Sequence, residues 1–121
     1  MTRPTILIVE DQPALRRVAE RILVRVGYPV LTAESGEEAL QVAGTHAERI
    51  GLLLTDLVMP GIGGRELART LRRQRPELRV LYLSGYSEDG VFDADDVPGG
   101  FLQKPFSVDT LLAAVQSALE S

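Results

Sequence analysis

Five polar side chains of this sequence stand at the ends of short, largely apolar runs. They are Glu10, Asp11, Asp56, Ser84 and Lys104. If the apolar runs are parallel strands of one sheet, these side chains meet at a single edge of that sheet. Three carboxylates in contact repel one another, and burial raises their pKa values unless a cation intervenes. A hard divalent ion bound by oxygen atoms, such as Mg²⁺, removes that conflict.

The other two side chains suit a phosphoryl group. Lys104 offers a compact positive charge, and Ser84 offers a hydroxyl donor. A carboxylate nucleophile, a metal ion, an ammonium and a hydroxyl together suit phosphoryl transfer, in which positioning and charge neutralisation provide most of the catalysis. The residue types therefore predict a phosphoryl-transfer site with Mg²⁺ or Mn²⁺ as its cofactor.

The apolar runs themselves predict five strands, at residues 5–9, 30–33, 50–55, 79–83 and 100–103. The first run is continuous and rich in β-branched residues, as expected of a strand that is buried on both faces. The segments between the strands predict helices, so the chain alternates between the two kinds of element. This alternation indicates a doubly wound α/β domain, in which helices cover both faces of a parallel sheet.

The predicted helices have recognisable ends and inner faces. Pro13 suits the first turn of a helix, and Gly27 occupies the position of a C-cap. Ser35, followed three residues later by Glu38, forms a capping box, and Ser107 caps the final helix. The side chains expected on the inner face of the first helix are Leu15, Val18, Ala19, Ile22, Leu23 and Val26. A further helix is expected within the acidic segment 87–98.

Length and charge limit the classes of function. The chain has 121 residues, which suits one domain covering residues 1–121. Its net charge of −4 argues against direct binding of nucleic acid, which needs a concentrated positive surface. The sequence has no cysteine, and no apolar run approaches the roughly 20 residues of a membrane span. We therefore expect a cytoplasmic protein that contacts neither membranes nor nucleic acid.

Four stretches, in order and spaced around the predicted strands, resemble the receiver domain of response regulators in two-component signalling. They are ILIVED at 6–11, LTDLVMPG at 54–61, LSGY at 83–86 and FLQKPF at 101–106. The resemblance covers nearly the whole chain and implies a flavodoxin-like (βα)5 domain with a sheet of order 2-1-3-4-5. The last two stretches further resemble receivers attached to hybrid sensor histidine kinases.

The resemblance implies a role for each side chain of the metal site. Asp56 matches the phosphoacceptor, Asp11 matches a direct Mg²⁺ ligand, and Glu10 matches a carboxylate that acts through water. The backbone carbonyl of Val58 would complete the protein's share of the coordination. Many relatives have Asp where this chain has Glu10, but the longer side chain still offers a carboxylate.

The same resemblance implies the residues that bind the phosphoryl group and respond to it. Ser84 and Lys104 would hold its oxygens, and Phe101 would be the aromatic switch that turns inward when Ser84 is drawn toward the phosphate. Pro105 matches a position that commonly follows a cis peptide bond. Serine stands here for the more usual threonine, and Phe101 has no phenolic hydroxyl, so this switch would work by packing alone.

The function implied is a signalling switch rather than an enzyme, whose only chemistry is its own phosphorylation and slow dephosphorylation. A histidine kinase or phosphotransfer protein would donate the phosphoryl group, contacting Arg16, Arg17 and Arg21. The change would reach the face formed by the helix at 87–98, the fifth strand and the final helix, where an unknown downstream protein would bind. The resemblance is compatible with a monomer or a weak dimer.

Other interpretations remain open from the sequence. A degenerate receiver would bind proteins without phosphorylation, and a hydrolase would need a second acid–base residue that we do not find. Glu10 and Asp11 could simply favour the start of a helix, and Lys104 could be a solvated loop residue. The arginines between 65 and 79 are expected to form a solvated helix face, and His46 is expected to face solvent.

Overall fold

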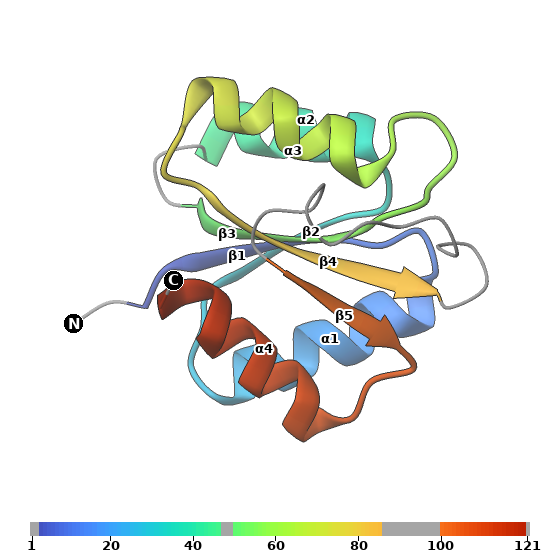
Figure 1. Cartoon of the computed structure of the whole chain (residues 1–121), viewed down its shortest axis with the longest axis vertical. Helices are drawn as coiled ribbons and strands as arrows, with labels where there is room; N and C mark the ends of the chain where they lie inside the picture. Colours follow the sequence, from blue (N-terminus) through green and yellow to red (C-terminus); the bar gives the residue numbers. More distant parts are fainter. Residues whose placement is uncertain (1–2, 47–49, 86–99, 121) are drawn as a thin grey trace.

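A parallel sheet of five strands runs through the centre of the structure, in the order β2-β1-β3-β4-β5 (Figure 1). The strands are β1 (Thr5–Val9), β2 (Val30–Ala33), β3 (Ile50–Asp56), β4 (Arg79–Gly85) and β5 (Phe101–Lys104). The predicted fold class and strand order are therefore confirmed. This computed structural model describes residues 3–46, 50–85 and 100–120, and the helix expected at 87–98 lies outside those ranges.

Three strands end later than the apolar runs predict. β3 ends at Asp56, which pairs with Leu83, and β4 ends at Gly85, which pairs with Lys104, the last residue of β5. The expected ends were Thr55, Leu83 and Gln103. Pairing with the neighbouring strand continues past the last apolar residue, so the strands carry Asp56 and Ser84 within the sheet itself.

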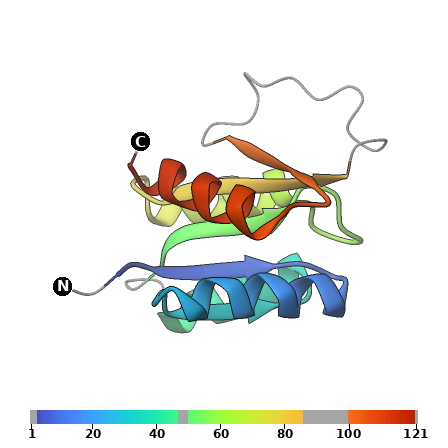
Figure 2. The same ribbon diagram turned by 90° about the horizontal axis from the view of Figure 1, so that it is seen from below.

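Helices form a layer on each face of the sheet. α1 (Pro13–Arg25) and α4 (Val108–Glu120) lie side by side on one face, as Figure 2 shows, and α2 (Gly36–His46) and α3 (Gly64–Gln74) cover the other. Within the described ranges, none of the helices has the length and apolar character that crossing a membrane requires.

Alternate residues of the strands pack into two separate cores. In β1, Leu7 packs on the side of α2 and α3, whereas Ile6 and Ile8 pack on the side of α1 and α4. All three side chains are fully buried. A strand with two buried faces has no solvent-facing position, which explains its continuous apolar sequence.

The inner face of α1 is narrower than predicted. Ala19 and Leu23 are buried, but Val18 and Val26 are 48% and 37% exposed, so their predicted inward orientation is wrong. Each residue turns about 100° around a helix, which carries Val18 away from the line through Ala19 and Leu23. Val26 is the C-cap and lies beyond the last helical turn.

The two predicted serine caps are present, whereas the C-cap of α1 is Val26 and not Gly27. Ser35 Oγ accepts a hydrogen bond from the Glu38 amide at 3.1 Å, and Ser107 Oγ accepts one from the Thr110 amide at 3.1 Å. The Glu38 carboxylate accepts from the amide of Glu34, one residue earlier than a standard capping box would have it. These caps satisfy amides that the first helical turn leaves without partners.

Candidate functional site

The carboxyl ends of the strands bring the predicted polar residues to one edge of the sheet. Glu10 directly follows β1, Asp56 is the last residue of β3, and Lys104 is the last residue of β5. Figure 1 shows the arrowheads of β4 and β5 pointing toward this edge. Because all five strands are parallel, residues far apart in the sequence become neighbours here.

Lys104 bridges two buried carboxylates. Its ammonium lies 2.9 Å from Glu10 Oε1 and 3.0 Å from Asp56 Oδ1. The Glu10 side chain is fully buried, and those of Asp56 and Lys104 are 6% and 16% exposed. One positive charge thus faces two negative charges in a space with little water, where electrostatic effects are strong.

The protein backbone also holds Glu10 firmly. Its amide donates to the Ala33 carbonyl of β2 at 3.1 Å, and its Oε2 accepts a hydrogen bond from the Gln12 amide at 3.1 Å. Its carbonyl oxygen accepts a hydrogen bond from the guanidinium of Arg16 at 2.7 Å. The interpretation of Lys104 as a solvated loop residue, and of Glu10 as only a helix-start residue, does not fit these contacts.

The third carboxylate, Asp11, is exposed at the mouth of the site. Glu10, Asp11 and Asp56 each offer a carboxylate oxygen, and these three atoms lie within 4.8 Å of one another. Glu10 Oε1 and Asp56 Oδ1 are buried and lack an aligned hydrogen-bond donor among the described residues, although the ammonium stands close to both. Three carboxylates beside a single ammonium carry an excess of negative charge, which fits a hard divalent cation.

Burial sets the ionisation of Asp56. Desolvation is the largest cause and raises the pKa of this carboxyl from 3.8 to about 7. The negative charges of Glu10 and Asp11 raise it further, whereas contact with Lys104 opposes the rise. For Lys104, burial acts to lower the pKa, but the contacts with Glu10 and Asp56 outweigh it and hold the pKa above its usual value.

Ser84 and Phe101 occupy different environments. Ser84 is 3% exposed in β4 and follows Leu83, the residue that pairs with Asp56. Phe101, by contrast, is 45% exposed. It begins an edge strand whose side chains alternate between exposed and half-buried positions. The exposed position of Phe101 does not test its predicted role as a switch, which stays a prediction.

Two other predicted positions lie in the loops beside the site. Val58 stands in the loop after β3 with its side chain 49% exposed. The Lys104–Pro105 peptide bond is cis. The metal-ligand role of the Val58 carbonyl stays a prediction.

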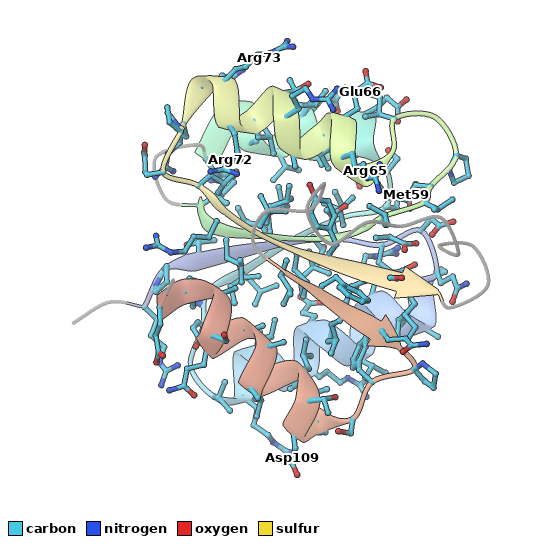
Figure 3. The ribbon with its side chains drawn as sticks, in the orientation of Figure 1. Met59, Arg65, Glu66, Arg72, Arg73 and Asp109 are labelled. Carbon is cyan, nitrogen blue, oxygen red and sulfur yellow. The ribbon has the colours of Figure 1, made fainter. Side chains whose placement is uncertain are left out.

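The arginines around α3 fall into two groups. Arg65, Arg69 and Arg73 are exposed on the helix, and Figure 3 shows Arg73 pointing away from the sheet. Arg75 instead donates to the Ile50 carbonyl at 2.8 Å and pairs with Glu77. The helix therefore presents a basic outer face, as expected, and its C-cap residue, Arg75, bonds to the start of β3.

Three further residues bear on the predictions. His46 is the last residue of α2 and is partly exposed. Arg17 and Arg21 are exposed, as contacts for a partner would be, but Arg16 is half-buried and bonded to Glu10. Sequence reasoning missed this bond. The signal that could have revealed the bond is the position of Arg16 in the first turn of α1, where a negative charge would suit the helix dipole better.

Comparison with known proteins assigns the family. Residues 6–116 match the response regulator receiver domain. The chain therefore belongs to the response regulator receiver family.

The curated relatives are longer proteins. The sensor kinase CckA of Brucella abortus (strain 2308) is 38% identical over 120 residues, which cover 96% of this chain and 12% of the relative. The transcriptional activator protein ExaE of Pseudomonas putida is 42% identical over 118 residues, which cover 94% of this chain and 54% of the relative. The chain thus spans about an eighth and about half of the length of these two proteins.

Solved structures of similar chains agree with the fold. The receiver domain from the hybrid histidine kinase CckA has a TM-score of 0.80 and 40% identity, with 95% of this chain and 98% of that chain covered. The chemotaxis response regulator CheY4 of Vibrio cholerae has a TM-score of 0.81 and 30% identity, with 98% and 100% covered.

Proposed function

We propose that this chain, as one receiver domain over residues 1–121, accepts a phosphoryl group on Asp56 in a Mg²⁺-dependent reaction. The donor would be the phosphohistidine of a histidine kinase or a phosphotransfer protein. The observation that carries the proposal is the contact of Lys104 with both Asp56 and Glu10, beside an exposed Asp11. This arrangement places a nucleophile, a cation-binding set and a phosphate-binding ammonium within one small site.

The phosphoryl transfer balances without any further reactant. A carboxylate oxygen of Asp56 attacks phosphorus in line, the phosphorus–nitrogen bond of the phosphohistidine breaks, and the imidazole nitrogen keeps that electron pair. The product is an aspartyl phosphate. Lys104 stands close enough to Asp56 to neutralise oxygens of the transferred group, which is the main form of catalysis for this reaction.

The ionisation of Asp56 gives a reason for the metal dependence. The attacking oxygen must be ionised, but burial raises the pKa of Asp56 to about 7, so much of it is protonated at neutral pH. When bound by Glu10, Asp11 and Asp56, Mg²⁺ supplies positive charge that favours the ionised carboxylate and the phosphoryl oxygens. Two of the side chains that would hold the ion, Glu10 and Asp11, directly follow β1, and the third, Asp56, is the last residue of β3.

The proposed response of the domain involves Ser84 and Phe101. Ser84 Oγ would bond a phosphoryl oxygen, and its movement would make room for the ring of Phe101. The exposed orientation of Phe101 is compatible with the unphosphorylated state of such a switch. A downstream protein would then read the changed surface of β5 and α4.

Intact-mass measurement after incubation with acetyl phosphate and Mg²⁺ tests the proposal. We expect one added phosphoryl group in the wild type, none in Asp56→Asn, and none when EDTA replaces Mg²⁺. No addition to the wild type after rapid quenching would overturn the proposal and favour a receiver that binds partners without phosphorylation. Addition that persists in Asp56→Asn would show that another residue is the acceptor.

A further inference from the structure

Arg16 makes a hydrogen bond to the backbone at the end of β1. This side chain belongs to the first turn of α1, reaches back toward the sheet and donates to the Glu10 carbonyl at 2.7 Å. A hydrogen bond from a charged donor is stronger than one between neutral groups. Glu10 directly follows β1, which ends at Val9, and its amide still pairs with the Ala33 carbonyl of β2.

The position of Arg16 is unfavourable for the helix alone. α1, whose residues are all described, has no acidic residue in its first turn and no side-chain hydrogen bond at its N-cap, Gln12. A positive charge at this end opposes the helix dipole. A residue that breaks a local rule in this way commonly serves a functional site. Here it serves the backbone that carries the metal-binding carboxylates.

The consequence for Asp11 follows from peptide geometry. The peptide group between Glu10 and Asp11 is planar, so fixing the Glu10 carbonyl oxygen also fixes the position of the Asp11 Cα. The next peptide is fixed as well, because the Gln12 amide donates to Glu10 Oε2 at 3.1 Å. Asp11 therefore lies between two anchored peptides, although its own side chain is exposed.

We infer that Arg16 is a positioning residue, which holds the Asp11 carboxylate where it completes the cation site with Glu10 and Asp56. This inference rests on the proposed function. It separates Arg16 from Arg17 and Arg21, whose exposed side chains remain candidates for contact with the phosphodonor. The inference concerns Mg²⁺ affinity, which is measured without any donor protein.

Calorimetric titration of the full chain with Mg²⁺ tests the inference. We expect Arg16→Met to raise the Kd for Mg²⁺ about tenfold, in the range found when residues that orient metal ligands are removed. Arg16→Lys, which keeps a charged donor, should restore part of the affinity. Arg17→Met is the matched control, because it removes the same charge from the neighbouring exposed position and should leave the Kd within twofold of the wild type.

The sign of the change separates positioning from simple electrostatics. Removing a positive charge beside a cation site would by itself strengthen Mg²⁺ binding. Weaker binding in Arg16→Met therefore cannot come from the lost charge. Phosphorylation by acetyl phosphate gives a second readout, because this small donor needs no docking surface. At saturating Mg²⁺ we expect the Arg16→Met rate to return to within about threefold of the wild type, since the variant changes metal affinity.

Each outcome decides the inference. An unchanged or lower Kd in Arg16→Met overturns it, and so does equal weakening in Arg17→Met. If Arg16→Met does not fold, Arg16→Gln, which loses the charged donor, carries the test, and a Kd equal to the wild type's overturns the inference. A wild type that binds Mg²⁺ and takes the phosphoryl group leaves the proposed function standing in all these cases. A wild type that does neither overturns both.

Discussion

At the scale of single residues, burial of the ionised Asp56 carboxylate lowers the stability of the folded state at high pH. The pKa of its carboxyl rises from 3.8 to about 7 on folding, so the folded state binds a proton that the unfolded state has released between these pH values. The contribution of Asp56 to stability is therefore fully present below about pH 4 and is lost as the pH rises through 7. A shift of roughly three pH units sets an upper limit of about 4 kcal/mol on this loss.

Asp56→Asn should remove this cost. In EDTA at pH 8 we expect the variant to be more stable than the wild type by about 2 kcal/mol, because one carboxylate and one ammonium then remain paired. The gain should shrink toward zero as the pH falls to 4. Urea unfolding at several pH values measures it. Asp109→Asn, at an exposed position labelled in Figure 3, is the control and should lose no more than a few tenths of a kcal/mol at any of these pH values. A constant gain for Asp56→Asn would contradict the assigned pKa.

Lys104→Met should have the opposite effect. It leaves Glu10 and Asp56 together without their shared positive charge, so we expect a loss of about 2–3 kcal/mol at pH 8 in EDTA. The loss should become smaller at pH 5, where Asp56 can take up a proton. Equal stability of the variant and the wild type at pH 8 would show that the ammonium does not compensate the buried carboxylates.

At the scale of elements, the site depends on how closely α3 follows β3. Gly64 begins α3, and its amide donates to the Leu57 carbonyl at 3.0 Å. A Cβ at this position would collide with the Asp56 carbonyl oxygen and lie 3.1 Å from the Leu57 Cα. Because both contacts are with backbone, neither can be relieved by a change of rotamer. The glycine therefore allows the helix to begin directly against Asp56.

Gly64→Ala should lower the free energy of unfolding by about 2–3 kcal/mol and slow phosphorylation by acetyl phosphate, since the clash displaces Asp56. Gly44→Ala in α2 is the matched control, because nothing lies within 4 Å of its added Cβ. We expect that change to stabilise the protein by roughly 0.5–1 kcal/mol through helix propensity. Urea unfolding compares the two variants. A tolerated Gly64→Ala would refute the close packing of α3 on β3.

The elements also show what the sequence can predict. Apolar runs identify the strands, because a strand buried on both faces has no polar position, and the parallel order then places Glu10, Asp56 and Lys104 together. Local patterns do not predict how far pairing with a neighbouring strand continues. The extension of β3 to Asp56, which pairs with Leu83, is therefore not visible in the sequence. Local patterns also do not predict which side of an edge strand is covered, as the exposed Phe101 illustrates. The bond from Arg16 to Glu10 needs a specific side-chain conformation, which spacing alone does not give.

At the scale of the whole molecule, the site exists only when both layers are assembled. Leu53 and Leu54 are neighbours in β3, but each packs into a different core, one with α2 and α3 and the other with α1 and α4. Both are fully buried. Because one sheet joins the two cores, we expect a single cooperative unfolding transition, as for most domains under about 150 residues. The carboxylates from β1 and β3 separate in that same transition.

Mg²⁺ should therefore stabilise the entire fold through the site. A ligand that binds only the folded state at 100 times its Kd adds about 2.7 kcal/mol, which corresponds to a rise in Tm on the order of 10 °C for a domain of this size. Asp11→Ala should unfold like the wild type in EDTA, because Asp11 is exposed, but should lose most of the Mg²⁺-dependent rise. Calorimetric scans in EDTA, in MgCl₂ and in NaCl of equal ionic strength separate metal binding from charge screening. An equal rise for the wild type and Asp11→Ala would place the bound cation elsewhere, whereas its selective loss would tie the stability of both layers to the carboxylates that follow β1.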